Sequence, residues 1–278
     1  MKILETFEIE DCSCIEPTLM DHLEERYTDM AVMMAADEAR LLIDEKEDPV
    51  ALALHDPKKW VVSSYIFREP ELSIIEKFEE CGGDIYQEKR DDYTDSIREY
   101  YCLEMVKEFS DVIEDNRPGR DLLVKELVEE VFGNGCRSLK TATDFCCGSG
   151  VATSVLKDMG KRTLSFDLDA SLISLGVQKG RLDPRRSMCI DGRAASAFCP
   201  ESDLCLALML GDINNMNYAI WESMIGEILA IGKKSLISVA TERESKMVEE
   251  WLKEEDASVT AFENTRDPIY DRFVLVAE

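Results

Sequence analysis

The rhythm of residues 141–278 is the feature that most restricts the fold. Short runs rich in β-branched and aromatic residues alternate there with connections, which span a dozen or more residues between the first six runs. Connections of that length allow the chain to cross over a sheet between parallel strands. We predict strands at 141–146, 162–166, 186–190, 203–208, 235–240, 258–262 and 273–277. The last two are too close for a helix and a crossover, so we expect them to pair antiparallel. The pattern predicts an α/β fold with a doubly wound, mostly parallel seven-stranded sheet and a C-terminal antiparallel β-hairpin.

The first part of the chain follows a different pattern. Apolar residues recur at helical spacing in 17–43 and again in 93–113, and prolines and a Gly-Gly pair divide the segment between them. We also expect a short strand at 3–9. Residues 1–115 are therefore predicted to form a mainly helical cap or substrate domain, and residues 116–278 a Rossmann-like domain.

The predicted boundary lies near Asn116, where the sequence Asn116-Arg-Pro-Gly119 interrupts the helical pattern. An amphipathic helix with Leu123 and Leu127 on its apolar side should follow. We expect it to stop at Gly133-Asn-Gly135.

The chain is strongly acidic, with 58 acidic and 32 basic residues and a formal net charge of −26. Residues 1–120 hold 32 acidic and 14 basic residues, a net charge of −18, and the remainder holds 26 and 18, a net charge of −8. Such a surface repels phosphate backbones and anionic lipids, so neither nucleic acid nor a membrane is an expected partner. The charge either keeps the protein soluble or selects a cationic or neutral substrate.

Ten cysteines raise the question of disulfides or metal binding. No signal peptide is recognisable. The spacings Cys12-Ser-Cys14 and Cys146-Cys147 match no zinc pattern, and His22 and His55 are the only histidines. No apolar run approaches the ~20 residues that a membrane helix requires. We expect reduced cysteines, no metal, and a soluble cytoplasmic protein.

A glycine-containing turn follows the first predicted strand of the α/β part. In Asp144-Phe-Cys-Cys-Gly148-Ser-Gly150, the glycines let backbone approach a ligand, and the helix that follows offers free N–H groups. The turn alone is also compatible with a purely structural strand-to-helix connection. Thr153 stands where a dinucleotide-binding fingerprint has glycine or alanine, which argues against NAD and FAD. A nucleoside triphosphate loop is excluded because the sequence has no Gly-Lys-Ser/Thr.

Two further acids follow the next two predicted strands. Asp167 comes 19 residues after Gly148, where a carboxylate can accept both ribose hydroxyls of an adenosine. Asp169 fits better as the N-cap of the next helix. Asp191 could accept the exocyclic amine of adenine. Because the carboxyl ends of parallel strands form the ligand crevice, Asp144, Asp167 and Asp191 should converge on one adenosine-containing ligand.

Because of the glycine turn and the acids Asp167 and Asp191, the segment 141–210 resembles the class I S-adenosylmethionine-dependent methyltransferases. The predicted fourth strand, which begins with Asp203-Leu-Cys-Leu-Ala-Leu, also fits this family. The resemblance implies S-adenosyl-L-methionine as cofactor and S-adenosyl-L-homocysteine as product. It implies that Gly148 and Gly150 flank the methionine moiety, that Asp144 holds its ammonium group, that Asp167 takes the ribose hydroxyls and that Asp191 takes the adenine amine. The predicted cofactor-binding residues are Asp144, Cys146, Gly148, Gly150, Asp167, Leu168, Asp191, Gly192 and Arg120.

Residues outside this set are candidates for other roles. Arg117 and Arg120 could grip the methionine carboxylate or form surface salt bridges. Tyr100-Tyr101 could close over the cofactor or belong to a core. His22 and His55 would be obvious bases, although a lone histidine in a helical segment is more often structural.

The substrate end should be formed by the segment after the fourth strand, where Asp212, Asn214, Asn215 and Tyr218 are catalytic candidates. Helix capping is their alternative role. The segment lacks the Asn-Pro-Pro-Tyr type of sequence found in relatives that methylate DNA bases or protein glutamine.

Three functions remain open. The first is in-line methyl transfer to a small or medium-sized acceptor, with residues 1–115 as a lid. The second is methylation of a protein that docks on the acidic front part, and the third is a non-catalytic, cofactor-binding or regulatory protein of the same fold. A homodimer is compatible with each of them.

Overall fold

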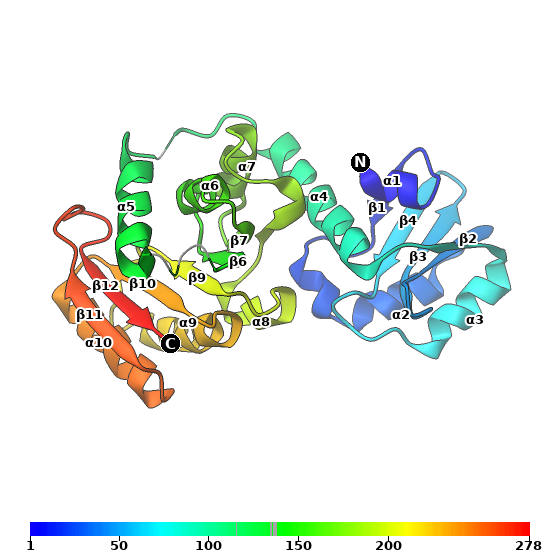
Figure 1. The fold of residues 1–278 in the computed structure, drawn as a ribbon. Coiled ribbons are helices and arrows are strands. Elements are labelled where there is room, and N and C mark those ends of the chain that lie inside the picture. Colours follow the sequence, from blue (N-terminus) through cyan, green and yellow to red (C-terminus); the bar gives the residue numbers. More distant parts are fainter. Residues whose placement is uncertain (115, 134, 136–137) are drawn as a thin grey trace. The chain divides into compact units, whose positions relative to one another are not determined.

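The computed structural model describes residues 1–278 except 115, 134 and 136–137. The chain forms two compact units, Met1–Glu104 and Met105–Glu278 (Figure 1). The division falls earlier than Asn116, close to the end of a long helix. No helix in the described part of the chain has both the length and the apolar character needed to cross a membrane.

The C-terminal unit contains a seven-stranded sheet. From edge to edge its strands are β11 (Val259–Glu263), β12 (Phe273–Ala277), β10 (Ser235–Val239), β9 (Leu204–Ala207), β6 (Thr141–Phe145), β7 (Arg162–Asp167) and β8 (Ser187–Cys189). The strand β12 is antiparallel to both neighbours, and all other pairs are parallel. The predicted doubly wound, mostly parallel sheet is confirmed, and the last two strands pair antiparallel as expected.

Helices cover both faces of this sheet. In Figure 1, α6 (Val151–Asp158) and α7 (Ala170–Gln178) lie on one face, and α9 (Tyr218–Ile231) and α10 (Glu242–Glu254) on the other. This follows from right-handed crossovers that leave β6 in one direction and β9 in the other. The strand order therefore switches between β6 and β9, where an open parallel sheet leaves a crevice at the carboxyl ends of its strands.

The predicted amphipathic helix before the sheet is α5 (Arg120–Phe132). Its buried residues Val124, Leu127 and Val128 join Leu156 of α6 and residues of the sheet in one apolar core. The helix ends at Phe132 with Gly133 as its C-cap, and Asn134 of the predicted stop lies outside the described residues.

The N-terminal unit differs from the prediction, because it is not mainly helical. It contains a five-stranded sheet in the order β1 (Cys12–Cys14), β4 (Lys59–Ser64), β3 (Pro49–Asp56), β2 (Glu38–Ile43) and β5 (Gly83–Gln87). Its helices are α1 (Lys2–Thr6), η1 (Met20–Leu23), α2 (Arg26–Met33), α3 (Leu72–Cys81) and α4 (Arg90–Glu108).

Two expectations for this unit are wrong for identifiable reasons. The apolar pattern at 17–43 continues past α2 into β2, since a short apolar run does not by itself distinguish a helix from a buried strand. Residues 50–54 of β3 are all buried, which is typical of a central strand rather than of a connection. The expected strand at 3–9 is instead the helix α1, which buries Ile3.

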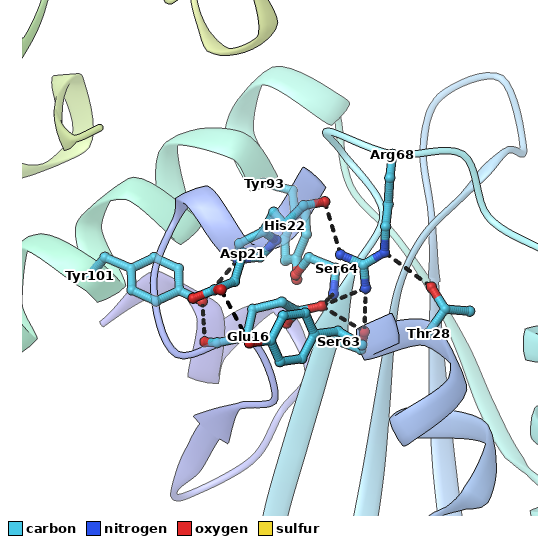
Figure 2. A network of polar contacts seen from close by, with 10 residues as sticks. Glu16, Asp21, His22, Thr28, Ser63, Ser64, Arg68, Tyr93 and Tyr101 are labelled. Atoms are coloured by element: carbon cyan, nitrogen blue, oxygen red, sulfur yellow. Dashed lines mark hydrogen bonds and ion pairs between the residues drawn. The ribbon is translucent and has the colours of Figure 1, made fainter. Parts of the chain in front are cut away.

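A buried ion pair lies between β1, β4 and the segment that follows β4 (Figure 2). One Nη of Arg68 lies 2.6 Å from Oε1 of Glu16, and the two side chains are 4% and 0% exposed. The same guanidinium donates to the Oγ of Ser63 and to Oγ1 of Thr28, both at 3.0 Å. Removing one partner of such a pair would leave a charge buried without compensation. The pair therefore fixes the local structure of this unit.

Candidate functional site

A cavity of about 180 Å³ opens in the C-terminal unit beside the carboxyl ends of β6 and β9. Its walls come from the turn between β6 and α6, from Asn116 and Arg120 at the start of α5, and from Leu208 and Met209 after β9. The position matches the topological switch point, where ligands bind in open α/β sheets.

The turn after β6 has three residues with positive φ: Cys146 at 55°, Gly148 at 54° and Gly150 at 82°. A Cβ on Gly148 would meet no atom within 4 Å, whereas one on Gly150 would lie 2.5 Å from Cδ2 of Leu182. Gly148 lines the cavity. The two glycines therefore have different roles: Gly148 leaves room beside the ligand space, and Gly150 permits close packing against Leu182.

This difference predicts unequal effects of alanine. We expect Gly150→Ala to lower the free energy of unfolding by about 2 kcal/mol, because left-handed backbone strain adds to overlap with Leu182. The matched variant Gly148→Ala should lose about 1 kcal/mol, from the backbone alone. Urea denaturation measures both. Equal losses in the two variants would contradict the packing role of Gly150.

Asp144, the last residue but one of β6, is 2% exposed. Its Oδ2 accepts a hydrogen bond of 2.5 Å from the hydroxyl of Thr153, which lies 2.7 Å from the Oγ of Ser165. Burial raises the pKa of the Asp144 carboxyl to about 7. A carboxylate held in this way favours a cationic ligand group, which would restore its ionised form. Residue spacing does not reveal this partner, because Thr153 stands out in the sequence only as a departure from the dinucleotide fingerprint.

Asp167 ends β7 and supports the glycine turn. Its Oδ2 accepts from the backbone N–H of Gly148 at 2.8 Å, and its Oδ1 from the N–H of Asp169 at 2.9 Å. Burial raises the pKa of Asp167. Each carboxylate oxygen retains a lone pair for another donor. Asp169 caps α7 through the N–H groups of Ser171 and Leu172, as predicted.

Asp191 follows β8 and is engaged by its own neighbour. It accepts from the backbone N–H of Arg193 at 2.9 Å and from the Arg193 guanidinium, whose Nη2 lies 2.5 Å from Oδ2. This contact holds the pKa of Asp191 below its ordinary value. The Arg193 side chain is 52% exposed, so it can move without unpacking a core. Gly192 beside it is buried, and a Cβ there would lie 2.9 Å from the ring of Phe145.

Asp144, Asp167 and Asp191 lie at the carboxyl ends of the neighbouring parallel strands β6, β7 and β8, on the same edge of the sheet as Cys146. Burial raises the pKa of this thiol, and the negative charges of Asp167, Asp144 and Asp191 raise it further. Leu168, which follows Asp167, is 67% exposed. Such an exposed apolar side chain is available to cover a ring.

Arg120 projects into the cavity from the start of α5. It lies 3.4 Å from Oδ2 of Asp271, and its guanidinium stacks 4.8 Å from the ring centroid of Tyr270. Nε of Arg120 and Oδ1 of Asn116 are buried without a hydrogen-bond partner among the described residues. Both predicted roles of Arg120 are therefore compatible with its position, since it is ion-paired yet keeps a donor unused.

The predicted catalytic residues lie in the segment after β9 and at the start of α9. Asp212 and Asn215 are exposed, and Nδ2 of Asn214 lies 3.2 Å from Oδ2 of Asp212. The hydroxyl of Tyr218 accepts from Nε1 of Trp251 at 2.7 Å, which ties it to α10. Nδ2 of Asn217, the residue before α9, donates to the carbonyl of Asp212 at 2.7 Å and fixes the segment.

The candidates in the N-terminal unit have partners within that unit. Tyr101 donates to the carbonyl of Glu16 at 2.7 Å and lies 2.8 Å from Nε2 of His22, and the hydroxyl of Tyr100 accepts from the N–H of Cys14 (Figure 2 shows Tyr101, Glu16 and His22). Burial lowers the pKa of His22 to about 4, so this imidazole is neutral at pH 7. These contacts support structural roles.

His55 and Arg117 do not line the cavity. Nδ1 of His55 lies 2.7 Å from Asp37. Arg117 is exposed. Among the described residues, no group of three or more His, Cys, Asp or Glu side chains could hold a metal ion, and the nine described cysteines are free thiols.

No protein-family model and no curated protein matches the sequence. Several solved structures are similar to the chain. They include magnesium protoporphyrin IX methyltransferase from Synechocystis PCC 6803 with bound SAM (15% identity over 66% of this chain and 96% of that one, TM-score 0.45). Ribosomal protein L11 methylase from Lactobacillus delbrueckii subsp. bulgaricus is also similar (14% identity over 58% of this chain and 79% of that one, TM-score 0.44). A third is the human methyltransferase 10 domain containing protein (13% identity over 66% of this chain and 97% of that one, TM-score 0.42).

Proposed function

We propose that the C-terminal unit binds S-adenosyl-L-methionine and that the protein transfers its methyl group to a small or medium-sized acceptor. The observation that carries the proposal is the position of Asp144, Asp167 and Asp191 at the carboxyl ends of three neighbouring parallel strands, on the edge of the sheet that holds the cavity lined by Gly148. The sheet order supports it, because β12 inserted antiparallel between β10 and β11 is the order of the methyltransferase family that the sequence resembles.

The unused polar atoms of the cavity suit the amino-acid end of the cofactor. Nε of Arg120 can donate to a carboxylate, and Oδ1 of Asn116 can accept from an ammonium group. The buried carboxyl of Asp144 lines the same cavity and would pair with that ammonium group. A ligand that carries both charges on one carbon would therefore supply partners for Nε of Arg120 and Oδ1 of Asn116, which have none in the described part of the chain.

The remaining cofactor contacts follow from the neighbouring strand ends. Asp167 would accept the ribose hydroxyls with the lone pairs left on its two oxygens. Asp191 would accept the adenine amine after Arg193 has moved. Leu168 would cover the adenine ring, and Gly192 would let the backbone approach it.

When bound, the cofactor supplies an electrophilic methyl group on a sulfonium, which an acceptor attacks in line with the breaking bond. The protein's contribution is to orient the two reactants and to exclude water. We propose that Asp212 and Asn214 orient the acceptor and that residues 1–104 select it. Met209, which lines the cavity and is 43% exposed, would provide an apolar wall on the acceptor side.

Isothermal titration with S-adenosylhomocysteine tests the binding step on the full chain. The expected result is one site per chain that is lost in Gly148→Arg, because the long side chain would occupy the cavity. Gly160→Arg is the matched control. Gly160 lies outside the cavity, has a positive φ as Gly148 does, and has no atom within 4 Å of a Cβ placed on it. This variant should bind S-adenosylhomocysteine as wild type does. If wild-type protein shows no binding, or if both variants bind as wild type does, the proposal fails.

A further inference from the structure

The C-terminal unit has a second cavity, of about 190 Å³, where β7 and β8 begin. Arg162 and Ser187, the first residues of these strands, line it, and α6 contributes Thr153 and Lys157. The cavity therefore lies toward the amino ends of the strands, away from the carboxyl ends that carry the three acids. Its charged lining consists of Lys157, Lys161, Arg162 and Arg186 against one acid, Asp183. We call it the basic pocket. In a chain with a net charge of −26, a net positive cavity is a local reversal of the overall charge.

Hydrogen bonds to backbone carbonyls position the ammonium groups of Lys157 and Lys161. Nζ of Lys157 lies 3.3 Å from the carbonyl oxygen of Arg181, and Nζ of Lys161 donates to the carbonyl of Leu139 at 2.7 Å. Backbone carbonyls orient an ammonium group but do not cancel its charge. Arg162 is exposed at the start of β7 and has no carboxylate within salt-bridge distance in the described part of the chain. The pocket therefore presents cationic donors that are already positioned.

Hydroxyl groups complete the lining. Thr153, Thr163 and Ser165 are buried and line the pocket. Ammonium and guanidinium groups are donors that bind the oxygens of phosphate, and the hydroxyls of Thr153 and Ser165, which are hydrogen-bonded to each other, line the same space. At ~30 Å³ for each water, the cavity has room for a tetrahedral oxyanion with some of its hydration.

We propose that the basic pocket binds a phosphate-class oxyanion, either free phosphate or the phosphate group of a small organic ligand. The pocket is separate from the proposed cofactor site, so this inference does not depend on methyl transfer. Its shape, its donors and its charge all favour a small dianion over a polymer, since the surrounding surface of the chain repels phosphate backbones.

One contact connects the basic pocket to the proposed cofactor site. Thr153 lines the pocket, lies 2.7 Å from Ser165, and donates at 2.5 Å to Asp144. An anion in the pocket would compete for the Ser165 proton that reinforces the hydrogen bond from Thr153 to Asp144. The negative charge of the anion would also oppose ionisation of Asp144. On the proposed function, phosphate should therefore weaken cofactor binding.

Phosphate binding is tested first, without cofactor. Inorganic phosphate and glycerol 3-phosphate are titrated into the full chain at constant ionic strength, with calorimetry and phosphorus NMR as readouts. We expect saturable binding that Arg162→Gln and Lys157→Gln each weaken about tenfold. Lys246→Gln, which removes the same charge from an exposed site on α10, should change it less than about twofold. Tighter binding of glycerol 3-phosphate would identify an organic ligand as the occupant, and tighter binding of phosphate the free ion.

Absence of saturation up to about 10 mM, or equal weakening by Lys246→Gln, would overturn the proposal. The coupling is then measured as the affinity for S-adenosylhomocysteine with and without saturating phosphate. A severalfold weakening that disappears in Arg162→Gln is expected, and an unchanged affinity would refute the coupling. If S-adenosylhomocysteine does not bind at all, the proposed function fails while the phosphate titration still decides the pocket.

Discussion

Replacing Asp167 by alanine is expected to weaken binding of S-adenosylhomocysteine by at least about 100-fold. The carboxylate would make two hydrogen bonds to the ribose, and bonds to charged groups contribute about 1.5–3 kcal/mol each. The variant also loses the acceptor for the N–H of Gly148, which holds the turn beside the cavity. Isothermal titration calorimetry of the variant against wild type measures the change.

Asp169 provides the matched control, two residues further along the chain. It caps α7 through the N–H groups of Ser171 and Leu172, so Asp169→Ala should cost about 1 kcal/mol of stability. Its effect on ligand affinity should stay below about threefold. A loss of affinity as large as that of Asp167→Ala would mean that the order of this loop, and not the ribose contact, controls binding.

The fold of the C-terminal unit could be predicted because its connections are restrictive. Between β6, β7, β8, β9 and β10 the chain has room for helical crossovers, and between β11 and β12 it has room only for a turn. The N-terminal sheet lacked this constraint. Its strands β3 and β4 are joined by a tight turn, and β2 follows α2 closely, so apolar spacing alone did not separate helix from strand.

The site could be predicted to the level of strand ends and no further. Position after a parallel strand was enough to bring Asp144, Asp167 and Asp191 together. The partners of these acids depend on side-chain directions that spacing does not reveal. Thr153 meets Asp144 because the first turn of α6 packs against β6 and β7, and Arg193 folds back on Asp191 within a single 3-10 turn.

Asp144→Asn is expected to make the ligand-free protein more stable at pH 8 while weakening cofactor binding. Burial raises the pKa of Asp144 to about 7, from 3.8 for the free side chain. Between these values the folded state retains a proton that the unfolded state has lost, so the free energy of unfolding falls as pH rises from about 4 to 7. At about 1.4 kcal/mol for each unit, the variant should gain up to about 4 kcal/mol at pH 8.

Asp203→Asn is the control for the sign of this effect. Backbone N–H groups of Lys140 and Thr141 lower the pKa of Asp203 to about 2, so its contribution to stability is lost as pH falls rather than as pH rises. Asp203→Asn should therefore destabilise the protein at neutral pH. Urea denaturation at pH 5 and pH 8 distinguishes the two variants, and a loss of stability at pH 8 in Asp144→Asn would contradict the buried, raised pKa.

Cofactor affinity should depend on pH in the opposite direction, because an ammonium group pairs only with ionised Asp144. Below pH 7 the affinity of wild-type protein should fall by up to about tenfold for each unit, and Asp144→Asn should bind weakly with little dependence on pH. The same carboxyl would then lower the stability of the empty protein and strengthen its complex. That combination is expected of a binding residue and not of a core acid, since a core acid would change stability and leave the pH dependence of affinity as it is.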